Sequence, residues 1–147
     1  MKHIDFYACL IAAIFTLNFT ILEKEATGIG QTAECNSSSE GRIYEMRTYT
    51  THPGKLDDLH ERFINHTIPI FGKYGMVSVG YWVPEEKDNT LVYILSHNCK
   101  EAAEKSWADF RSDPDWQQAY QASRTDGPLV RNVESVFMKA TSYSQIR

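Results

Sequence analysis

Alternating apolar and polar residues mark four segments of the chain as β-strands. Residues 42–50, RIYEMRTYT, are rich in Ile, Tyr and Thr, and residues of different polarity alternate along them with a period of two. Residues 76–84, 90–97 and 130–141 are also predicted strands. The polar stretch EEKDN separates the second strand from the third and predicts a hairpin. Side chains on a strand alternate between two faces, so the two faces of each predicted strand can be compared.

Apolar residues at three- and four-residue spacing predict a helix after the first strand. The helix starts at the Pro53-Gly54 turn, because proline suits a first helical turn and cannot continue a strand ladder. Its apolar stripe comprises Leu56, Leu59, Phe63, Ile70 and Tyr74. Pro69 removes a backbone donor within this stripe, so we expect a kink or a break just before Ile70.

A second helical region is predicted between the third and fourth strands. Asn98 with Glu101 forms a capping box at its start, and Ser112 with Asp115 restarts a short helix that runs to about Arg124. Three aromatic residues of this region have the spacing of a packed core, namely Trp107, Phe110 and Trp116. We therefore interpret them as core residues rather than as a set that stacks on a ligand.

The predicted order of elements is strand, helix, strand, strand, helical region, strand. This order is typical of α+β domains of the ferredoxin-like class, βαββαβ, in which a four-stranded antiparallel sheet carries its helices on one face. The later strands are apolar at both parities, as Val77 and Tyr81 against Met76 and Trp82 illustrate. A sheet with one free face should alternate apolar and polar residues. We therefore expect a second copy of the chain to cover the other face, giving a homodimeric α/β barrel.

The first strand has one charged face, formed by Glu45, Arg47 and Tyr49. We expect this face to lie against the second subunit, and two interpretations of it remain open. In one, Glu45 and Arg47 form a buried ion pair that anchors the dimer or the strand register. In the other, the face is the wall of a cavity, where Arg47 binds an anionic group and Tyr49 donates a hydrogen bond.

Three further residues are candidates for a ligand site. Trp82 and Tyr93 lie on predicted strands and can face a second sheet or a cavity, whereas His97 ends the third strand and can lie at the cavity mouth. The histidines form no H-x-x-x-H or H-E-x-x-H motif, so no metal site is predicted. The sequence contains no Gly-rich phosphate loop and no nucleophile with its base, and we expect no cofactor.

Composition and charge limit the classes of molecule that the protein is expected to bind. The chain is 42% hydrophobic and 23% charged, which is ordinary for a folded domain. Its formal net charge of −4 argues against nucleic acid, which is normally bound by a basic patch. We expect a second copy of the chain and a small anionic or aromatic ligand as partners.

An apolar run from Phe6 to Leu22 precedes the predicted domain. It has the character of a secretory signal or a membrane anchor, so we assign residues 1–27 to such a segment, 28–41 to a flexible linker and 42–147 to the domain. The protein is then secreted or periplasmic, or is held at a membrane through this segment alone.

The three cysteines, Cys9, Cys35 and Cys99, have no metal-ligand spacing. Their spacing favours isolated thiols. A disulfide between Cys35 and Cys99 is the alternative in an oxidising compartment.

Several short motifs, in order, resemble the NIPSNAP family. They are E-M-R-T-Y-T followed by P-G-K-L, G-Y-W at 80–82, L-V-Y-I-L at 91–95 and K-S-W-A-D-F-R-S-D-P-D-W at 105–116. The resemblance covers residues from about 43 to about 137 and implies the dimeric α/β barrel of the ferredoxin-like class. It also implies no agreed reaction or catalytic residues. Eukaryotic members are mitochondrial proteins linked to trafficking and quality control, and small bacterial members are mostly uncharacterised.

We therefore expect a domain that binds a small ligand or a partner protein as a homodimer. One alternative is a cofactor-independent monooxygenase or isomerase that acts in the barrel cavity, because relatives on the same fold perform such chemistry. In that case Arg47 and Tyr49 would orient an anionic or phenolic substrate. Another alternative is a purely structural interaction module.

Overall fold

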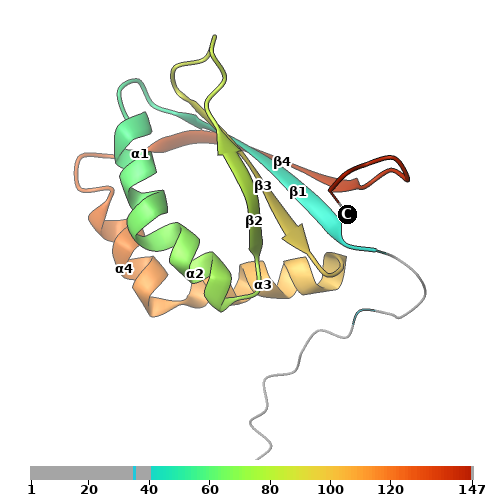
Figure 1. Ribbon diagram of the computed structural model, residues 1–147. Coiled ribbons are helices and arrows are strands. Elements are labelled where there is room, and N and C mark those ends of the chain that lie inside the picture. The colour runs from blue at the N-terminus through green and yellow to red at the C-terminus, as the bar shows by residue number, and fades with distance from the viewer. Residues whose placement is uncertain (1–34, 36–40, 147) are drawn as a thin grey trace, which may run out of the picture. The chain divides into compact units, whose positions relative to one another are not determined.

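One antiparallel sheet forms the centre of the computed structural model, which describes residue 35 and residues 41–146 (Figure 1). The strands are β1 Ile43–Thr51, β2 Val77–Trp82, β3 Thr90–His97 and β4 Val130–Lys139. Their order in the sheet is β2-β3-β1-β4, and every neighbouring pair is antiparallel. The predicted ferredoxin-like α+β fold, including the hairpin between β2 and β3, is confirmed.

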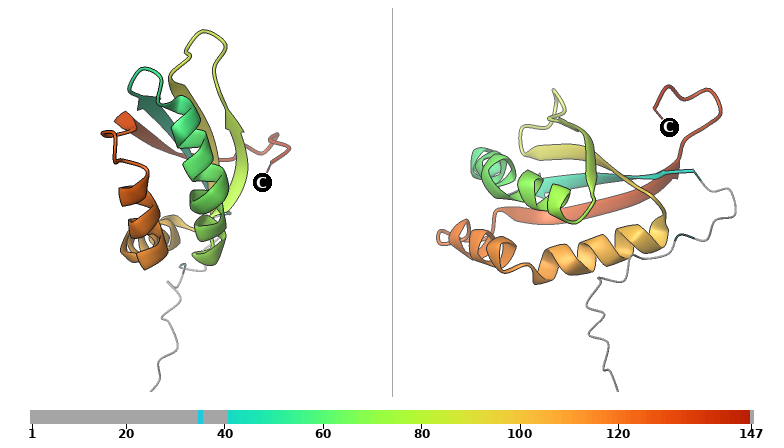
Figure 2. Two further views of the ribbon diagram at one scale, coloured as in Figure 1. Left: turned by 90° about the vertical axis from the view of Figure 1, so that its left-hand side faces the viewer. Right: turned by 60° about the horizontal axis from the view of Figure 1, so that its bottom comes forward.

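Two helical regions connect the strands, one between β1 and β2 and the other between β3 and β4. After β1 come α1 Leu56–Arg62, a π-helical segment η1 Phe63–Thr67 and α2 Ile68–Lys73, and between β3 and β4 come α3 Lys100–Ser112 and α4 Pro114–Ala122. Figures 1 and 2 show that all of them lie on one side of the sheet. The helical region before β2 thus covers the same face as the region before β4.

Of the two outcomes predicted for Pro69, a kink or a break just before Ile70, the break does not occur. The helical elements α1, η1 and α2 follow one another directly, and the irregularity is a π-helical segment that lies upstream of the proline. A π turn inserts a residue into the ladder, so the backbone bond that Pro69 cannot make falls next to an already irregular stretch. The Thr67 hydroxyl donates to the Arg62 carbonyl at 3.3 Å within this segment.

The charged face of β1 lies on the helix-covered side, which corrects the expectation that it faces a second subunit. Arg47 is paired with Tyr93 across the sheet, and Glu45 is paired with Leu95, so these side chains share a face. Tyr93 and Leu95 belong to the core cluster that the helices complete. Residue alternation could not assign the face, because β2 and β3 are apolar on both faces.

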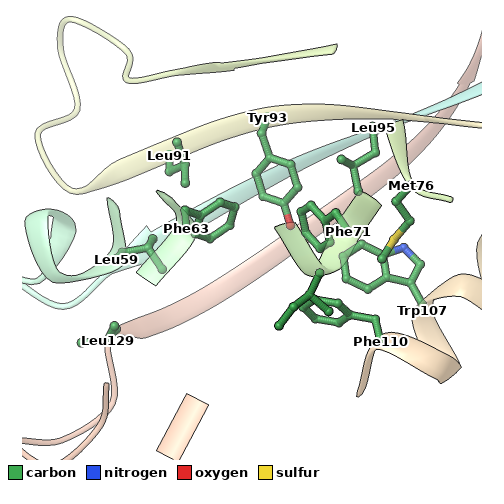
Figure 3. Close-up of a cluster of buried hydrophobic side chains, with 11 residues drawn as sticks. Leu59, Phe63, Phe71, Met76, Leu91, Tyr93, Leu95, Trp107, Phe110 and Leu129 are labelled. Atoms are coloured by element: carbon green, nitrogen blue, oxygen red, sulfur yellow. The ribbon is translucent and has the colours of Figure 1, made fainter. Parts of the chain in front are cut away.

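The core between sheet and helices is rich in aromatic residues (Figure 3). It consists of Leu59, Phe63, Ile70, Phe71, Met76, Leu91, Tyr93, Leu95, Trp107, Phe110 and Leu129. Figure 3 shows the Tyr93 side chain pointing from β3 into the middle of this cluster, next to Phe71. Trp107 and Phe110 are core residues, as their helical spacing predicts.

The starts of α3 and α4 differ from the predicted capping boxes. Cys99, rather than Asn98, precedes α3, and no side chain caps this end. Asp113, rather than Ser112, caps α4 by accepting from the backbone N–H groups of Asp115 and Trp116 at 2.8 and 3.0 Å. Both boundaries are shifted by one residue from the sequence prediction.

Cys35 and Cys99 form a disulfide, so the prediction of isolated thiols is wrong. Their Cα atoms are 5.8 Å apart although 64 positions separate them in the sequence. Spacing along the chain does not reveal this proximity, because folding of β1 and β3 as neighbours brings the two segments together.

No helix among the described residues is long and apolar enough to cross a membrane. The predicted signal or anchor segment, and the predicted linker apart from residues 35 and 41, lie outside the described residues.

Candidate functional site

The carboxylate of Glu45 lies at the centre of a buried polar cluster built from four elements. Arg47 Nη1 and Ser135 Oγ donate to its Oε1 at 2.6 and 2.7 Å. The Trp107 indole N–H donates to Oε2 at 2.6 Å, and His97 Nε2 lies 3.2 Å from the same oxygen. Two partners come from neighbouring strands and one from α3, so sheet and helix meet at this carboxylate.

Glu45 is held in its ionised form. Burial by itself raises a carboxyl pKa, but the hydrogen bonds from His97, Ser135 and Trp107 and the charge of Arg47 outweigh it and lower the pKa of Glu45 to about 2. A carboxylate with so low a pKa is a poor proton acceptor near neutral pH. The cluster is therefore suited to hold the fold rather than to move protons.

Arg47 is the charged partner of Glu45 and is also packed between rings. Its guanidinium lies 4.2 Å from the centre of the Trp107 ring and 5.6 Å from that of Tyr49. The ion pair predicted from the sequence is present. Arg47 Nε is buried and donates to no described atom.

Tyr49 and Tyr93 continue this face of the sheet into the core. Their rings meet edge to face with centroids 5.3 Å apart. The Tyr93 hydroxyl is buried, and although Tyr49 is its neighbour the two are not at hydrogen-bonding geometry. Burial, together with this neighbour, raises the pKa of Tyr93 well above its usual value.

The structure brings together five of the six candidates, with different roles. Glu45, Arg47, Tyr49 and Tyr93 share the helix-covered face. His97 is on that face too, but it is buried against Glu45 rather than placed at the mouth of their cavity.

Trp82 is separate from the other candidates. It pairs with Val92 on the opposite face of the sheet and is 50% exposed. Its ring covers Gly80, where a Cβ atom would come within 2.6 Å of the indole. This explains why glycine stands at that position of β2.

An inner cavity of about 290 Å³ lies between the helices and the strands β1 and β4. It is bounded by rings and aliphatic side chains, with a few polar residues. Its lining is Tyr49, Arg62, Phe63, Thr67, Phe71, Trp107, Phe110, Trp116, Tyr120, Val130, Arg131, Asn132 and Val133. The aromatic residues that we interpreted as core alone therefore also form cavity walls.

A larger groove of about 750 Å³ adjoins the inner cavity. It shares the walls Tyr49, Trp107, Phe110, Trp116 and Tyr120 with the cavity. The groove adds Arg47, Arg111, Pro114, Gln117, Gln118 and Gln121. Arg47 and Tyr49 thus line a groove, but it lies on the helix-covered side of the sheet and not against the second subunit, where the cavity interpretation placed them.

Arg62 is the most deeply buried charged residue of the lining that sequence reasoning missed. Its side chain reaches the inner cavity from the end of α1, and only 5% of the residue is exposed. The guanidinium lies 5.2 Å from the Trp116 ring centre and 5.4 Å from that of Tyr120. A signal was present, because Arg62 follows Leu59 by three positions and thus interrupts the apolar stripe of the helix.

The linings of cavity and groove carry one sign of charge. They contain four arginines, namely Arg47, Arg62, Arg111 and Arg131, and no aspartate or glutamate. This contrasts with the net charge of −4 for the whole chain. Arginine edges among aromatic walls are suited to an anionic, planar molecule. Among the described residues, no group of three or more potential metal ligands occurs.

Comparison with known proteins gives one family. The family model NIPSNAP matches residues 44–145, most of the chain. No match is found among the curated proteins.

Solved structures similar to the chain include members of this family. One is a NIPSNAP family protein of unknown function from Agrobacterium tumefaciens, 23% identical, with a TM-score of 0.65 over 74% of this chain and 96% of its own. Another is an uncharacterized NIPSNAP-like domain protein from Burkholderia xenovorans, 20% identical, with a TM-score of 0.64 over 72% of this chain and 90% of its own.

SnoaB from Streptomyces nogalater, a cofactor-independent oxygenase, is also similar in fold. It is 18% identical, with a TM-score of 0.54 over 73% of this chain and 99% of its own. At this identity the similarity concerns the fold and not the chemistry.

Proposed function

The chain belongs to the NIPSNAP family, and on this premise we propose that it is a homodimeric domain that binds a small planar ligand between its helices and its sheet. The observation that carries the proposal is the inner cavity with its adjoining groove. Small-molecule sites are typically concave, mostly apolar and lined by a few well-placed polar groups. The cavity has these features, with aromatic walls and arginine side chains.

The character of the lining supports binding over proton-transfer chemistry. No carboxyl, imidazole or thiol side chain is among the described residues that line cavity and groove. Glu45, the nearest carboxylate to Arg47, is ionised and fully engaged. An oxygenase or isomerase would have to rely on tyrosine and arginine and on the reactivity of its substrate, and we rank this alternative second.

Ligand binding can be tested by thermal shift against a library of neutral and anionic aromatic compounds. A compound that binds the native state at a hundredfold its Kd stabilises it by about 2.7 kcal/mol. We expect stabilisation of the wild type and of Ile64→Trp, whose site is exposed on η1, and none of Val133→Trp, which fills the cavity. The proposal would be contradicted if a compound stabilised both variants equally, or if no compound stabilised any of the three proteins.

The dimer is proposed from the face of the sheet that the helices leave free. Cross-strand pairing puts a row of apolar side chains there, namely Met46, Val77, Trp82, Val92, Ile94 and Val136. Val77, Trp82 and Val136 are each about half exposed, and an uncovered apolar face of this extent is unusual for a monomer. A second copy of the same sheet would cover it symmetrically.

Light scattering after size exclusion tests the dimer. At micromolar concentration we expect the mass of two chains for the wild type and for Ile64→Glu. Val136→Glu, which places a charge on the free face, should give the mass of one chain. A monomeric wild type would refute this part of the proposal.

Export is proposed as well, and the disulfide between Cys35 and Cys99 supports it, because such bonds persist mainly in oxidising compartments. The protein would then act outside the cytoplasm, free or held by its N-terminal segment. Thiol labelling of the protein taken from its native host should find Cys99 blocked. A freely labelled Cys99 would argue against export.

A further inference from the structure

We propose that Arg62 binds the anionic group of the ligand and that the ligand class is an aromatic carboxylate of one or two rings. This inference rests on the proposed ligand-binding function and specifies it. Arg47, which sequence reasoning had favoured for the same task, has a different role.

The charge of Arg62 has no counter-charge among the residues that the structure describes. Its Nη1 donates to the Ser123 hydroxyl at 3.1 Å, and its Nε is buried without an acceptor. No carboxylate of the described residues lies within ion-pair distance of it. Burial lowers the pKa of Arg62, but a guanidinium stays protonated in proteins. A buried charge without a partner is costly, so an anion that enters the cavity offsets a cost already present.

Arg47 differs because its charge is already compensated. Its Nη1 donates to Glu45 at 2.6 Å, and a second anion there would meet the Glu45 carboxylate as a like charge. Arg47 therefore serves as a wall of the groove, stacked on Trp107, and keeps Glu45 in place. Arg62 has the one guanidinium of the lining that is nearly fully buried and has no ion-pair partner in the described part of the chain.

The donors that Arg62 leaves free favour a carboxylate. Among the described residues neither Nε nor Nη2 has an acceptor, so the donors along one edge of the planar guanidinium are unsatisfied. Such an edge matches the two oxygens of a carboxylate in a bidentate pair. A phosphate group would need more donors, and Arg131 on the exposed side is the other cation of the inner cavity.

The walls next to Arg62 favour an aromatic body. Trp116 and Tyr120 lie beside the guanidinium, their ring centroids 5.5 Å apart, and Phe110 packs on Trp116 at 4.4 Å. A flat ring gains stacking contacts against such walls. The inner cavity of about 290 Å³ is at the lower limit of small-molecule pockets, so the part of a ligand that lies beside Arg62 has room for one or two rings.

Calorimetric titration of the full chain with matched acids and amides tests the proposal. The probes are benzoate, cinnamate and 2-naphthoate, each compared with its primary amide. For at least one pair we expect the acid to bind the wild type about tenfold or more tightly than the amide, because a hydrogen-bonded charge pair is worth more than a neutral one. The preference should disappear in Arg62→Met and survive in Arg131→Met.

The outcomes separate this inference from the proposed function. Equal binding of acids and amides to the wild type, or undiminished acid preference in Arg62→Met, overturns the role of Arg62 while ligand binding stands. Absence of binding by every probe overturns the aromatic-acid class, and the wider library then decides on ligand binding itself. The ratio of acid affinity to amide affinity is measured on the wild type, so this test does not depend on whether a variant folds. Arg62→Lys, which keeps the charge but loses the planar edge, should retain only part of the preference for the acid.

Discussion

Arg47 and Arg62 lie on the same side of the sheet, and they differ in whether a carboxylate compensates their charge. Both stack on aromatic rings, Arg47 on Trp107 and Arg62 on Trp116. Arg47 has a buried carboxylate, Glu45, as its partner, whereas no described carboxylate pairs with Arg62. A charge compensated within the chain contributes to folding, and a charge left open beside a cavity is available to a ligand.

The surroundings of the two residues support this distinction. The Glu45 cluster ties β1 to β3, β4 and α3 through hydrogen bonds of 2.6–3.2 Å. The Arg62 guanidinium instead donates, among the described residues, to the Ser123 hydroxyl alone, beyond the end of α4. Substitutions in the two regions should therefore separate stability from binding.

The largest effect is expected from Glu45→Gln. The change keeps the shape of the side chain but leaves Arg47 buried without a counter-charge, which should cost about 3–5 kcal/mol of unfolding free energy. Urea denaturation measures it, with Glu104→Gln at an exposed position of α3 as the matched control. A loss below about 1 kcal/mol would mean that the cluster does not hold the fold.

Loss of the disulfide should come next. Cys99→Ser frees the start of α3, the helix that brings Trp107 to Glu45, and should reduce the unfolding free energy by about 2–4 kcal/mol. Affinity for aromatic acids should remain, because Arg62 lies on another helix. Denaturation with and without reductant measures this loss. An unfolding free energy of the wild type that reductant leaves unchanged would contradict the prediction.

Acid should destabilise the protein through the same cluster. The pKa of Glu45 falls from 4.5 to about 2 on folding, so its contribution is complete above pH 4.5 and is lost as the pH falls toward 2. By pH 2.5 the loss should reach about 2–3 kcal/mol. Asp113, whose pKa is lowered first of all by its hydrogen bond from Lys73, titrates in the same direction. The difference between wild type and Glu45→Gln isolates Glu45, and parallel pH curves of the two would refute the assignment.

The smallest effect is expected from Arg62→Met without ligand. Removal of an uncompensated buried charge should change the unfolding free energy by less than about 1 kcal/mol, or raise it, although two ring contacts are lost. The thermal midpoint measures this change. A loss as large as that of Glu45→Gln would show that Arg62 is a structural residue, and the distinction between the two arginines would fail.

Sequence patterns predicted the fold well, because strand and helix periods are local properties. The order of elements, the hairpin before Thr90 and the pairing of Glu45 with Arg47 all follow from spacing within a few residues. Which face of the sheet the helices cover was not recoverable, since β2 and β3 are apolar on both faces. The Cys35–Cys99 bond was missed for a related reason, because it depends on contact between distant segments.

The site was recovered only in part. Arg47 and Tyr49 do line the groove, but Tyr93 is a core residue and Trp82 lies on the other face. Arg62 was overlooked because a single arginine in a helix is usually exposed. Its importance depends on the missing counter-charge, which can be seen only in three dimensions.

The most direct test of the distinction between the two arginines is a crystal structure of the protein with the tightest-binding aromatic carboxylate. The carboxylate oxygens should lie about 3 Å from Nε and Nη2 of Arg62, with the ring against Trp116 and the Glu45–Arg47 pair intact. A ligand whose carboxylate is bound by Arg47, or whose ring lies outside the cavity between helices and sheet, would contradict it.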